Sequence, residues 1–402
     1  MTNSPDIAAV PDTDTDTDTD TSADADPIAE IASRFVEREE HINVIFAAIL
    51  AKLPVFFLGL WGEAKSAMLR AIARSIEEID ADPDNEFFDI QVSENTTFDQ
   101  VIGPRSIRAL QERDSIHHRT KGYAPEASFC YFDEIFKASG PLLDGLLEFT
   151  NEGTYRNDDR KCTAKRLAIV ASSNEMPTDR RWAPAVDRFV VRLYAGRLES
   201  WASMRQVAFG PRDVTAGLTP FWSLQDVREA QAETQACTLP LSLDPALERI
   251  WTGLRAAGID VSTRRFQQAQ YLARAVAVLD GRDEVEPKDL LILQHCLWNA
   301  PEEIEKVATL VEDAVFPGAA EARTIFRAAY ATYKRLEASK ESRSNTVVAD
   351  AEEAIGELRS AAERIGTLAN RNPHLQQYAD RATALCRKAA GFIAEIMTAG
   401  LG

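Results

Sequence analysis

The sequence predicts an α/β protein in which a parallel five-stranded sheet is sandwiched by helices, with a helical lid and a further C-terminal helical region. Three observations carry this prediction. Apolar runs of strand length alternate with amphipathic helical segments through the first half of the chain. The run at residues 55–59 leads into a small-residue turn and a Lys-Ser pair, and the run at residues 128–134 ends in two carboxylates. In sheets of this kind, ligands bind beyond the carboxyl ends of the strands.

The first run continues over residues 55–66 as Val-Phe-Phe-Leu-Gly-Leu-Trp-Gly-Glu-Ala-Lys-Ser, which indicates a strand, a phosphate-binding loop and the start of a helix. Gly59 and Gly62 would let backbone amides approach an oxyanion. Lys65 would reach the β- and γ-phosphates of a nucleotide, and the Ser66 hydroxyl would take a Mg²⁺ position.

The loop departs from the usual pattern in two places. Ala64 occupies the position of the usual second Gly, and Leu60-Trp61 stands where small residues or Pro are commoner. Glu63 and Ala64 complete the set of loop residues that we expect against the nucleotide. Since such a loop could by itself be an ordinary strand-to-helix turn, a second motif is needed to decide.

The second motif is the strand at residues 128–134, which ends in Asp133 and Glu134. Asp133 would hold Mg²⁺ through water, and Glu134 would orient and polarise the attacking water. A further apolar run, residues 167–174, ends in Asn174, which would face the same edge of the sheet and help to hold the water or the γ-phosphate. Asn is also a common turn residue, which is the alternative for Asn174.

Composition describes a globular protein with an acidic balance. The 402 residues are 45% hydrophobic and 27% charged, with a formal net charge of −18. The first 27 residues hold eight Asp and no Lys or Arg, so we expect a disordered acidic tail. About −10 remains for the rest of the chain, which argues against non-specific binding to a polyanion.

Cysteine usage and hydropathy indicate a cytoplasmic protein without a membrane span. The five Cys are odd in number and lack metal-ligand spacing, so buried reduced thiols are the favoured interpretation. The most apolar region, residues 44–61, is interrupted by Lys52 and Pro54, so it predicts a helix followed by a strand.

Beyond these motifs, the pattern predicts strands at residues 87–92 and 189–193, an insertion at 95–122 and a projecting hairpin at 154–165. Helices are expected at 66–78, 140–151, 243–257, 263–279 and 287–297, and a polar linker at 339–346. The predicted organisation is an acidic tail (1–27), a nucleotide-binding α/β domain (28–200), a connector (201–238), a helical lid (239–302) and a helical hairpin or coiled coil (303–402).

Taken together, these motifs resemble the AAA+ P-loop ATPases, and more narrowly the MoxR family in its RavA-type branch. The resemblance covers roughly residues 30 to 310. The residues that carry it are Gly-x-x-Gly-x-Ala-Lys-Ser of the loop, Gly103-Pro104, Gly122-Tyr123-x-Pro125-Glu126-Ala127, Phe132-Asp133-Glu134-Ile135, Asp187-Arg188-Phe189, Val261-Ser262-x-Arg264-Arg265 and Asp289-Leu290-x-x-Leu293-x-x-Cys296-Leu297-Trp298. Ala64 matches this branch, whereas Leu60-Trp61 in place of Pro-Pro departs from it.

The resemblance implies a ring, usually a hexamer, with ATP and Mg²⁺ at subunit interfaces. Arg188 would then be an arginine finger reaching the γ-phosphate of a neighbour, with Arg192 a weaker candidate. A salt bridge from Arg188 to Asp187 or Glu175 within the subunit is the alternative.

Two lid arginines are candidates for a second contact to the γ-phosphate. Arg264 looks like the lid sensor of the family, and the neighbouring Arg265 is the other possibility, since the sequence does not decide which side chain turns inward. A solvated charge at a helix start is the alternative.

The family's inserted segments would face the opening of the ring, with Phe98 and Tyr155 as candidate contacts to a substrate. The implied function is a chaperone-like remodelling ATPase that acts on a partner protein, in particular one with a von Willebrand factor A domain. Two alternatives remain: a motor or restriction-type translocase stimulated by nucleic acid, which the acidic balance disfavours, and a nucleotide-gated scaffold that does not hydrolyse ATP.

Overall fold

The structure, a computed structural model, describes residues 26–158, 160–177, 182–338 and 347–399. The predicted acidic tail (1–27) therefore lies almost wholly outside the described residues, as does the predicted linker at 339–346. Among the described residues, no helix combines the length and the hydropathy that crossing a membrane requires.

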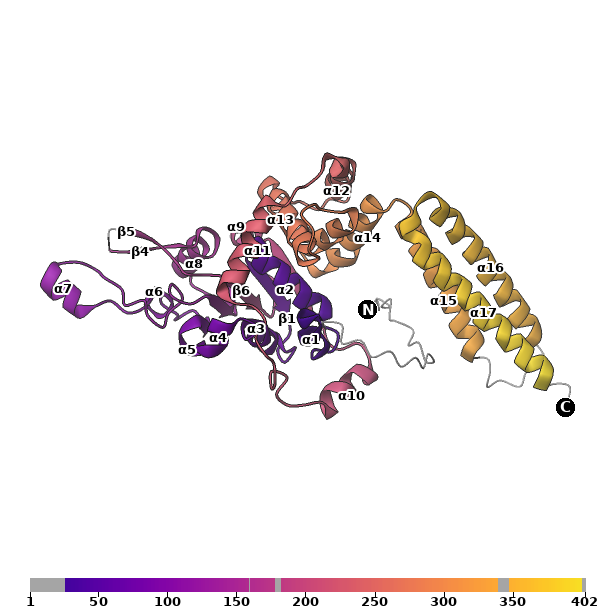
Figure 1. The fold of residues 1–402 in the computed structure, drawn as a ribbon, viewed down its shortest axis with the longest axis horizontal. Helices are drawn as coiled ribbons and strands as arrows, with labels where there is room; N and C mark the ends of the chain where they lie inside the picture. Colours follow the sequence, from indigo (N-terminus) through magenta and orange to yellow (C-terminus); the bar gives the residue numbers. More distant parts are fainter. Residues whose placement is uncertain (1–25, 159, 178–181, 339–346, 400–402) are drawn as a thin grey trace.

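A five-stranded sheet with all neighbouring strands parallel lies at the centre of the N-terminal half (Figure 1). Its order is β2 (Phe87–Gln91), β3 (Phe129–Asp133), β6 (Ala168–Ser173), β1 (Val55–Gly59) and β7 (Val191–Ala195). The three central strands are almost entirely buried, which explains why they read as continuous apolar runs. The predicted fold class is confirmed, and the carboxyl ends of β1, β3 and β6 meet at one edge.

Helices cover both faces of this sheet (Figure 1). They are α1 (Pro27–Ser33), α2 (Glu39–Ala51), α3 (Lys65–Ala73), α4 (Glu77–Ala81), α5 (Pro83–Glu86), α8 (Gly140–Glu152), α9 (Ala183–Arg188) and α11 (Leu224–Ala236). The helix predicted at 66–78 ends at Ala73, because the Ser75 carbonyl accepts hydrogen bonds from the amides of Phe221 and Trp222. A contact distant in sequence thus breaks a helix that local propensity would continue.

Two segments project from the sheet on the side away from the C-terminal helices (Figure 1). One is the insertion with α6 (Phe98–Ile102) and α7 (Ile107–Arg113), and the other is the hairpin of β4 (Thr154–Asn157) and β5 (Arg160–Thr163). Asn157 Oδ1 accepts a hydrogen bond of 2.7 Å from the backbone of His118, so the hairpin braces the insertion.

The connector begins with an excursion that carries α10 (Trp201–Phe209), drawn below the sheet in Figure 1. Trp201, Met204, Val207 and Phe209 of this helix are all exposed. The chain then returns to the sheet domain, where the Trp222 ring packs edge-on against Phe46 at 5.6 Å.

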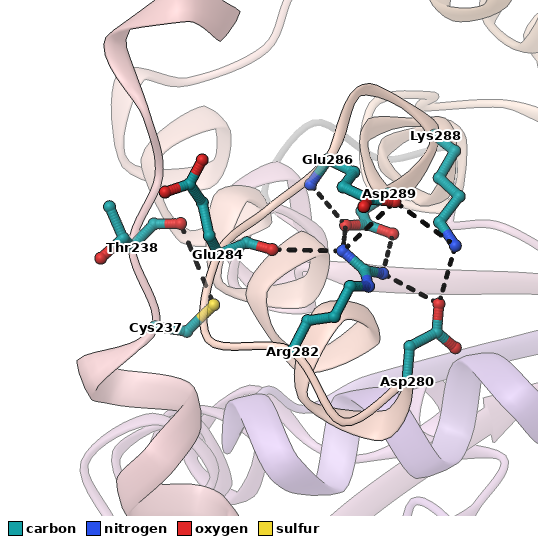
Figure 2. Close-up of polar contacts among 8 residues, drawn as sticks. All are labelled: Cys237, Thr238, Asp280, Arg282, Glu284, Glu286, Lys288 and Asp289. Atoms are coloured by element: carbon teal, nitrogen blue, oxygen red, sulfur yellow. Dashed lines mark hydrogen bonds and ion pairs between the residues drawn. The ribbon is translucent and has the colours of Figure 1, made fainter.

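The lid consists of α12 (Asp244–Ala256), α13 (Thr263–Leu279), a 3-10 helix (Pro287–His295) and α14 (Ile304–Val315), which follows a short 3-10 turn (Pro301–Glu303). The predicted boundary at residues 302 and 303 therefore lies too early, because Val307 and Val311 of α14 are buried in the core of the sheet and lid. The helix predicted at 287–297 is a 3-10 helix that ends at His295 and begins with a capping box between Glu286 and Asp289. Figure 2 shows how Arg282 fastens the preceding turn: it donates 2.7 and 2.8 Å hydrogen bonds to the buried Asp289 and one of 2.8 Å to Asp280.

Three long helices form the C-terminal region, α15 (Ala319–Ala338), α16 (Val347–Arg371) and α17 (Gln376–Ala399). They share a hydrophobic core separate from that of the sheet and lid, with Leu358, Ile365 and Ala382 fully buried in it. The sequence predicts a hairpin or a coiled coil for this region. A third helix arises because Asn372-Pro373 ends α16. The Asn372 side chain then caps the turn that leads into α17.

Candidate active site

The loop between β1 and α3 takes two left-handed backbone conformations. Gly62 has a φ of +85°, and Ala64, at the N-cap of α3, has a φ of +57°. Such a conformation costs a residue with a Cβ roughly 1–2 kcal/mol, which is why Gly is usual at this position. Gly59 also allows β1 to approach β7, because a Cβ there would come within 2.7 Å of the Ala195 carbonyl oxygen, and its predicted role in the phosphate loop stays a prediction.

Lys65 is the first residue of α3 and is buried. Its Nζ donates to the carbonyl oxygens of Gly59 (2.5 Å) and Leu60 (3.2 Å) and to Asn174 Oδ1 (3.2 Å). Burial lowers the pKa of Lys65, while the carboxylates of Asp133 and Glu134 act in the opposite direction. The ammonium group thus joins the loop after β1 to the end of β6.

Asn174 also connects Lys65 to Glu134. Its Nδ2 donates a short hydrogen bond to Glu134 Oε1, while its Oδ1 accepts from Lys65. Glu134 is buried, has a φ of +57°, and lies 3.6 Å from Lys137 Nζ. Strained, buried carboxylates of this kind concentrate at functional sites. The structure therefore brings Lys65, Glu134 and Asn174 into one continuous chain of contacts.

Asp133 lies beside this chain, in a second network. Ser172 Oγ donates a short hydrogen bond to Asp133 Oδ1. Because the Ser172 hydroxyl has only one proton, the Tyr131 hydroxyl must donate the 2.9 Å hydrogen bond that joins it to Ser172 Oγ. Burial raises the pKa of Tyr131, which keeps this proton in place. Ser66, Tyr131 and Asp133 line the same cavity of about 320 Å³ together with Gln91.

Sequence reasoning missed Tyr131, Ser172 and the buried Arg38, which pairs with Glu63 of the loop at 2.9 Å. The period-two alternation of a strand places Tyr131 on the same face of β3 as Asp133, so that residue could have been found. Arg38 precedes Glu63 by 25 residues and belongs to no recognisable motif.

The candidate finger Arg188 is half-buried at the last position of α9. Its neighbour Asp187 is occupied elsewhere: Oδ1 lies 3.4 Å from Arg265 Nη1, and Oδ2 accepts a 2.7 Å hydrogen bond from Ser262. The alternative of an Arg188–Asp187 pair is therefore disfavoured, and the finger role stays a prediction.

Burial argues against the predicted roles of the other two candidate arginines. Arg192 is 0% exposed and donates to the carbonyl oxygens of Val186, Phe189 and Trp298, so it does not reach a neighbouring subunit. Arg265 is 1% exposed and donates to Asn299 Oδ1 at 2.8 Å. Arg265 is held inside the joint between sheet and lid, whereas Arg264 is exposed, and the contact of Arg264 to the nucleotide stays a prediction.

The two candidate substrate contacts are also corrected. Tyr155, in the hairpin, is buried. The half-buried ring of Phe98 packs against Gly145, where an added Cβ would come within 2.9 Å of the ring. Large apolar side chains do reach the surface of the insertion, but they are those of Ile107, Leu110 and Ile116.

Comparison with known proteins matches both parts of this architecture. A sequence model described as the MoxR domain of MoxR-vWA-beta-propeller ternary systems matches residues 24–210, and one described as an AAA lid domain matches residues 246–311. The uncharacterized protein MJ0812 of Methanocaldococcus jannaschii is 31% identical over 284 residues, which are 69% of this chain and 72% of that protein.

Two further relatives agree with these matches. Protein MoxR of Methylorubrum extorquens is 23% identical over 327 residues, covering 71% of this chain and 90% of that protein. A solved structure from Cytophaga hutchinsonii, provisionally named an ATPase, superposes with a TM-score of 0.55 at 20% identity and covers 72% of this chain and 92% of that one, which supports the fold. This chain belongs to the MoxR family of AAA+ ATPases.

Proposed function

We propose that this chain hydrolyses ATP and uses the energy to remodel a partner protein in the manner of a chaperone. The observation that carries the proposal is the position of Asn174, whose side chain links Lys65 of the phosphate loop to the Glu134 carboxylate after β3. Lys65 would exchange the loop carbonyls for phosphate oxygens. Glu134 would accept the proton of the attacking water, and Asn174 would hold that carboxylate in place.

The donor set beside this chain suits Mg²⁺. The Ser66 hydroxyl and the Asp133 carboxylate supply the hard oxygen ligands that this ion prefers, and both line one cavity. A bound Mg²⁺ would offset the negative charge of the phosphates there. The bonds from Ser172 and from the Glu134 amide fix Asp133 Oδ1, so the orientation of the carboxylate is set in advance.

Membership of the family also supports a proposal for the assembly and the partner. We propose a ring, usually a hexamer, in which Arg188 completes the site of the neighbouring subunit and Arg264 contacts the γ-phosphate from the lid. The matching family model is named after systems that contain a vWA protein, which supports a partner with a von Willebrand factor A domain. The RavA-type branch and a cytoplasmic location stay predictions.

Two variants test the catalytic assignments. Glu134→Gln should bind ATP, keep the assembly intact by size-exclusion chromatography, and lose turnover. Arg188→Ala should lose about 10³-fold in turnover, because an arginine supplied in trans contributes that order of rate. Adding excess Glu134→Gln subunits should partly restore the Arg188→Ala protein, since each donates an intact Arg188.

Arg228→Ala, which changes an exposed arginine of α11, is the matched control and should behave as wild type. Normal hydrolysis by Glu134→Gln would remove that residue from the mechanism, and failure of the mixture would place Arg188 within its own subunit. ATP binding without turnover in the wild-type assembly would favour the scaffold alternative. Stimulation of turnover by DNA or RNA would favour the nucleic-acid motor.

A further inference from the structure

A buried cation lies next to the phosphate loop, and neither the proposed catalysis nor the proposed Mg²⁺ site uses it. Arg38 precedes α2 and is only 6% exposed. Its guanidinium donates to Glu63 Oε2 (2.9 Å), to the Gly196 carbonyl oxygen (2.5 Å) and to the Glu37 carbonyl oxygen (2.9 Å). One side chain thereby fastens the phosphate loop to the end of β7 and to the α1–α2 corner.

The α1–α2 corner is itself braced, so Arg38 starts from a fixed position. Glu37 has a φ of +58°, and its carboxylate accepts a 3.0 Å hydrogen bond from the Glu199 amide. Arg34, one turn earlier, donates to the carbonyl oxygens of Val214 (3.3 Å) and Ala216 (2.7 Å). Both ends of the α10 excursion are therefore attached to the α1–α2 corner, and these contacts hold the corner in place.

The Glu63 carboxylate creates an electrostatic problem for binding a nucleotide. A carboxylate in a phosphate-binding loop repels a polyanionic ligand, and the Glu63 side chain is only 15% exposed, so water screens its charge poorly. Arg38 places a positive charge 2.9 Å from that carboxylate. The pair as a whole is neutral, so the loop can present its amides and Lys65 without an opposing charge.

We infer that Arg38 is a positioning residue of the nucleotide site, which acts through Glu63 by fixing the loop and cancelling the charge of that carboxylate. This inference rests on the proposed binding of ATP. Arg38 need not contact the nucleotide, because its donors are already directed to Glu63, Gly196 and Glu37.

The test measures the affinity of the full-length protein for ADP, with a fluorescent ADP analogue and Mg²⁺, in variants of the pair. Arg38→Met leaves the Glu63 charge unopposed and should raise Kd about 10-fold or more, the effect of one poorly screened charge near the phosphates. In steady-state assays KM should rise, with kcat changing less than about threefold, because the groups around Glu134 are untouched.

The decisive variant is Arg38→Met combined with Glu63→Gln, which removes both charges. If Arg38 acts through Glu63, the double variant should bind ADP within about threefold of wild type. If the double variant binds as poorly as Arg38→Met, then Arg38 contacts the phosphates directly or serves only the fold, and the inference is wrong.

Arg228→Met, which removes the charge of an exposed arginine of α11, is the matched control, and its Kd should stay within about twofold of wild type. Unchanged ADP binding by Arg38→Met would overturn the inference while leaving the proposed function intact. A wild-type protein that binds no ADP would instead contradict the proposed function itself.

Discussion

The joint between the sheet and the lid is held by two buried arginines that share one acceptor, a side-chain amide oxygen. Arg192 comes from β7 and Arg265 from α13, and both donate to Asn299 Oδ1. Burial, and after it the charge of Arg265, lower the pKa of Arg192 to about 9, while Asp187 acts in the opposite direction. Asp187→Asn would leave two like charges in the joint without this compensation.

The expected cost of Asp187→Asn follows from this arrangement. Removing one partner of a buried ion pair typically destabilises by about 3–5 kcal/mol, because an uncompensated charge stays buried. The Asp187 side chain is 32% exposed, so its interaction with Arg265 is partly screened, and we take the lower end, about 3 kcal/mol.

Urea denaturation followed by tryptophan fluorescence tests this value, since Trp298 is buried in the joint. Adding Arg265→Met to Asp187→Asn should recover part of the loss, because it removes one of the two like charges. Glu305→Gln, which changes an exposed carboxylate of α14, should cost less than about 0.5 kcal/mol. A loss below about 1 kcal/mol for Asp187→Asn, or no recovery in the double variant, would refute the assignment.

Three further outcomes can be measured directly. Arg264→Ala, at an exposed position, should leave thermal stability within about 0.5 kcal/mol of wild type yet lower ATP turnover about 100-fold if the lid contacts the phosphate. Burial lowers the pKa of His41 from 6.5 to about 4, so the unfolded chain binds the proton more readily between these values. The free energy of unfolding should therefore fall as pH drops from about 6.5 to 4, by up to about 3 kcal/mol, and His41→Gln should flatten this slope in denaturation at pH 7 and 4.5. Asp289→Asn should weaken the Arg282 network by about 2–3 kcal/mol, which hydrogen exchange over residues 280–295 would detect as faster opening.

The strands were predictable because their signals are local. The central strands β1, β3 and β6 are buried on both faces, so each appears as an apolar run whose ends lie close to the observed bounds. The polar residues that follow two of these runs, Asp133 and Asn174, had to share an edge once the strands were parallel. The parallel direction of the strands was therefore enough to predict that these polar side chains lie at one edge of the sheet.

The arginines were not predictable, because burial of a charge depends on partners distant in the sequence. Arg192 is buried because Asn299 and the Trp298 carbonyl, more than 100 residues later, accept its hydrogen bonds. From the local sequence pattern alone, such an arginine is predicted to be either a solvated charge or a functional residue. The same limit applies to Tyr155, since the polar sequence of its hairpin gives no sign that this ring turns inward.

Among the polar contacts that attach the lid to the sheet domain, two differ in strength. One is the buried joint of Arg192, Arg265 and Asn299, and the other is an exposed pair, in which His295 Nε2 of the lid lies 2.9 Å from Glu40 Oε1 at the start of α2. The hydrogen bond from His295 lowers the pKa of Glu40, but most of that carboxylate stays in water, where ion pairs contribute little. If the lid moves during turnover, the exposed pair should therefore separate first, while the buried joint acts as the pivot.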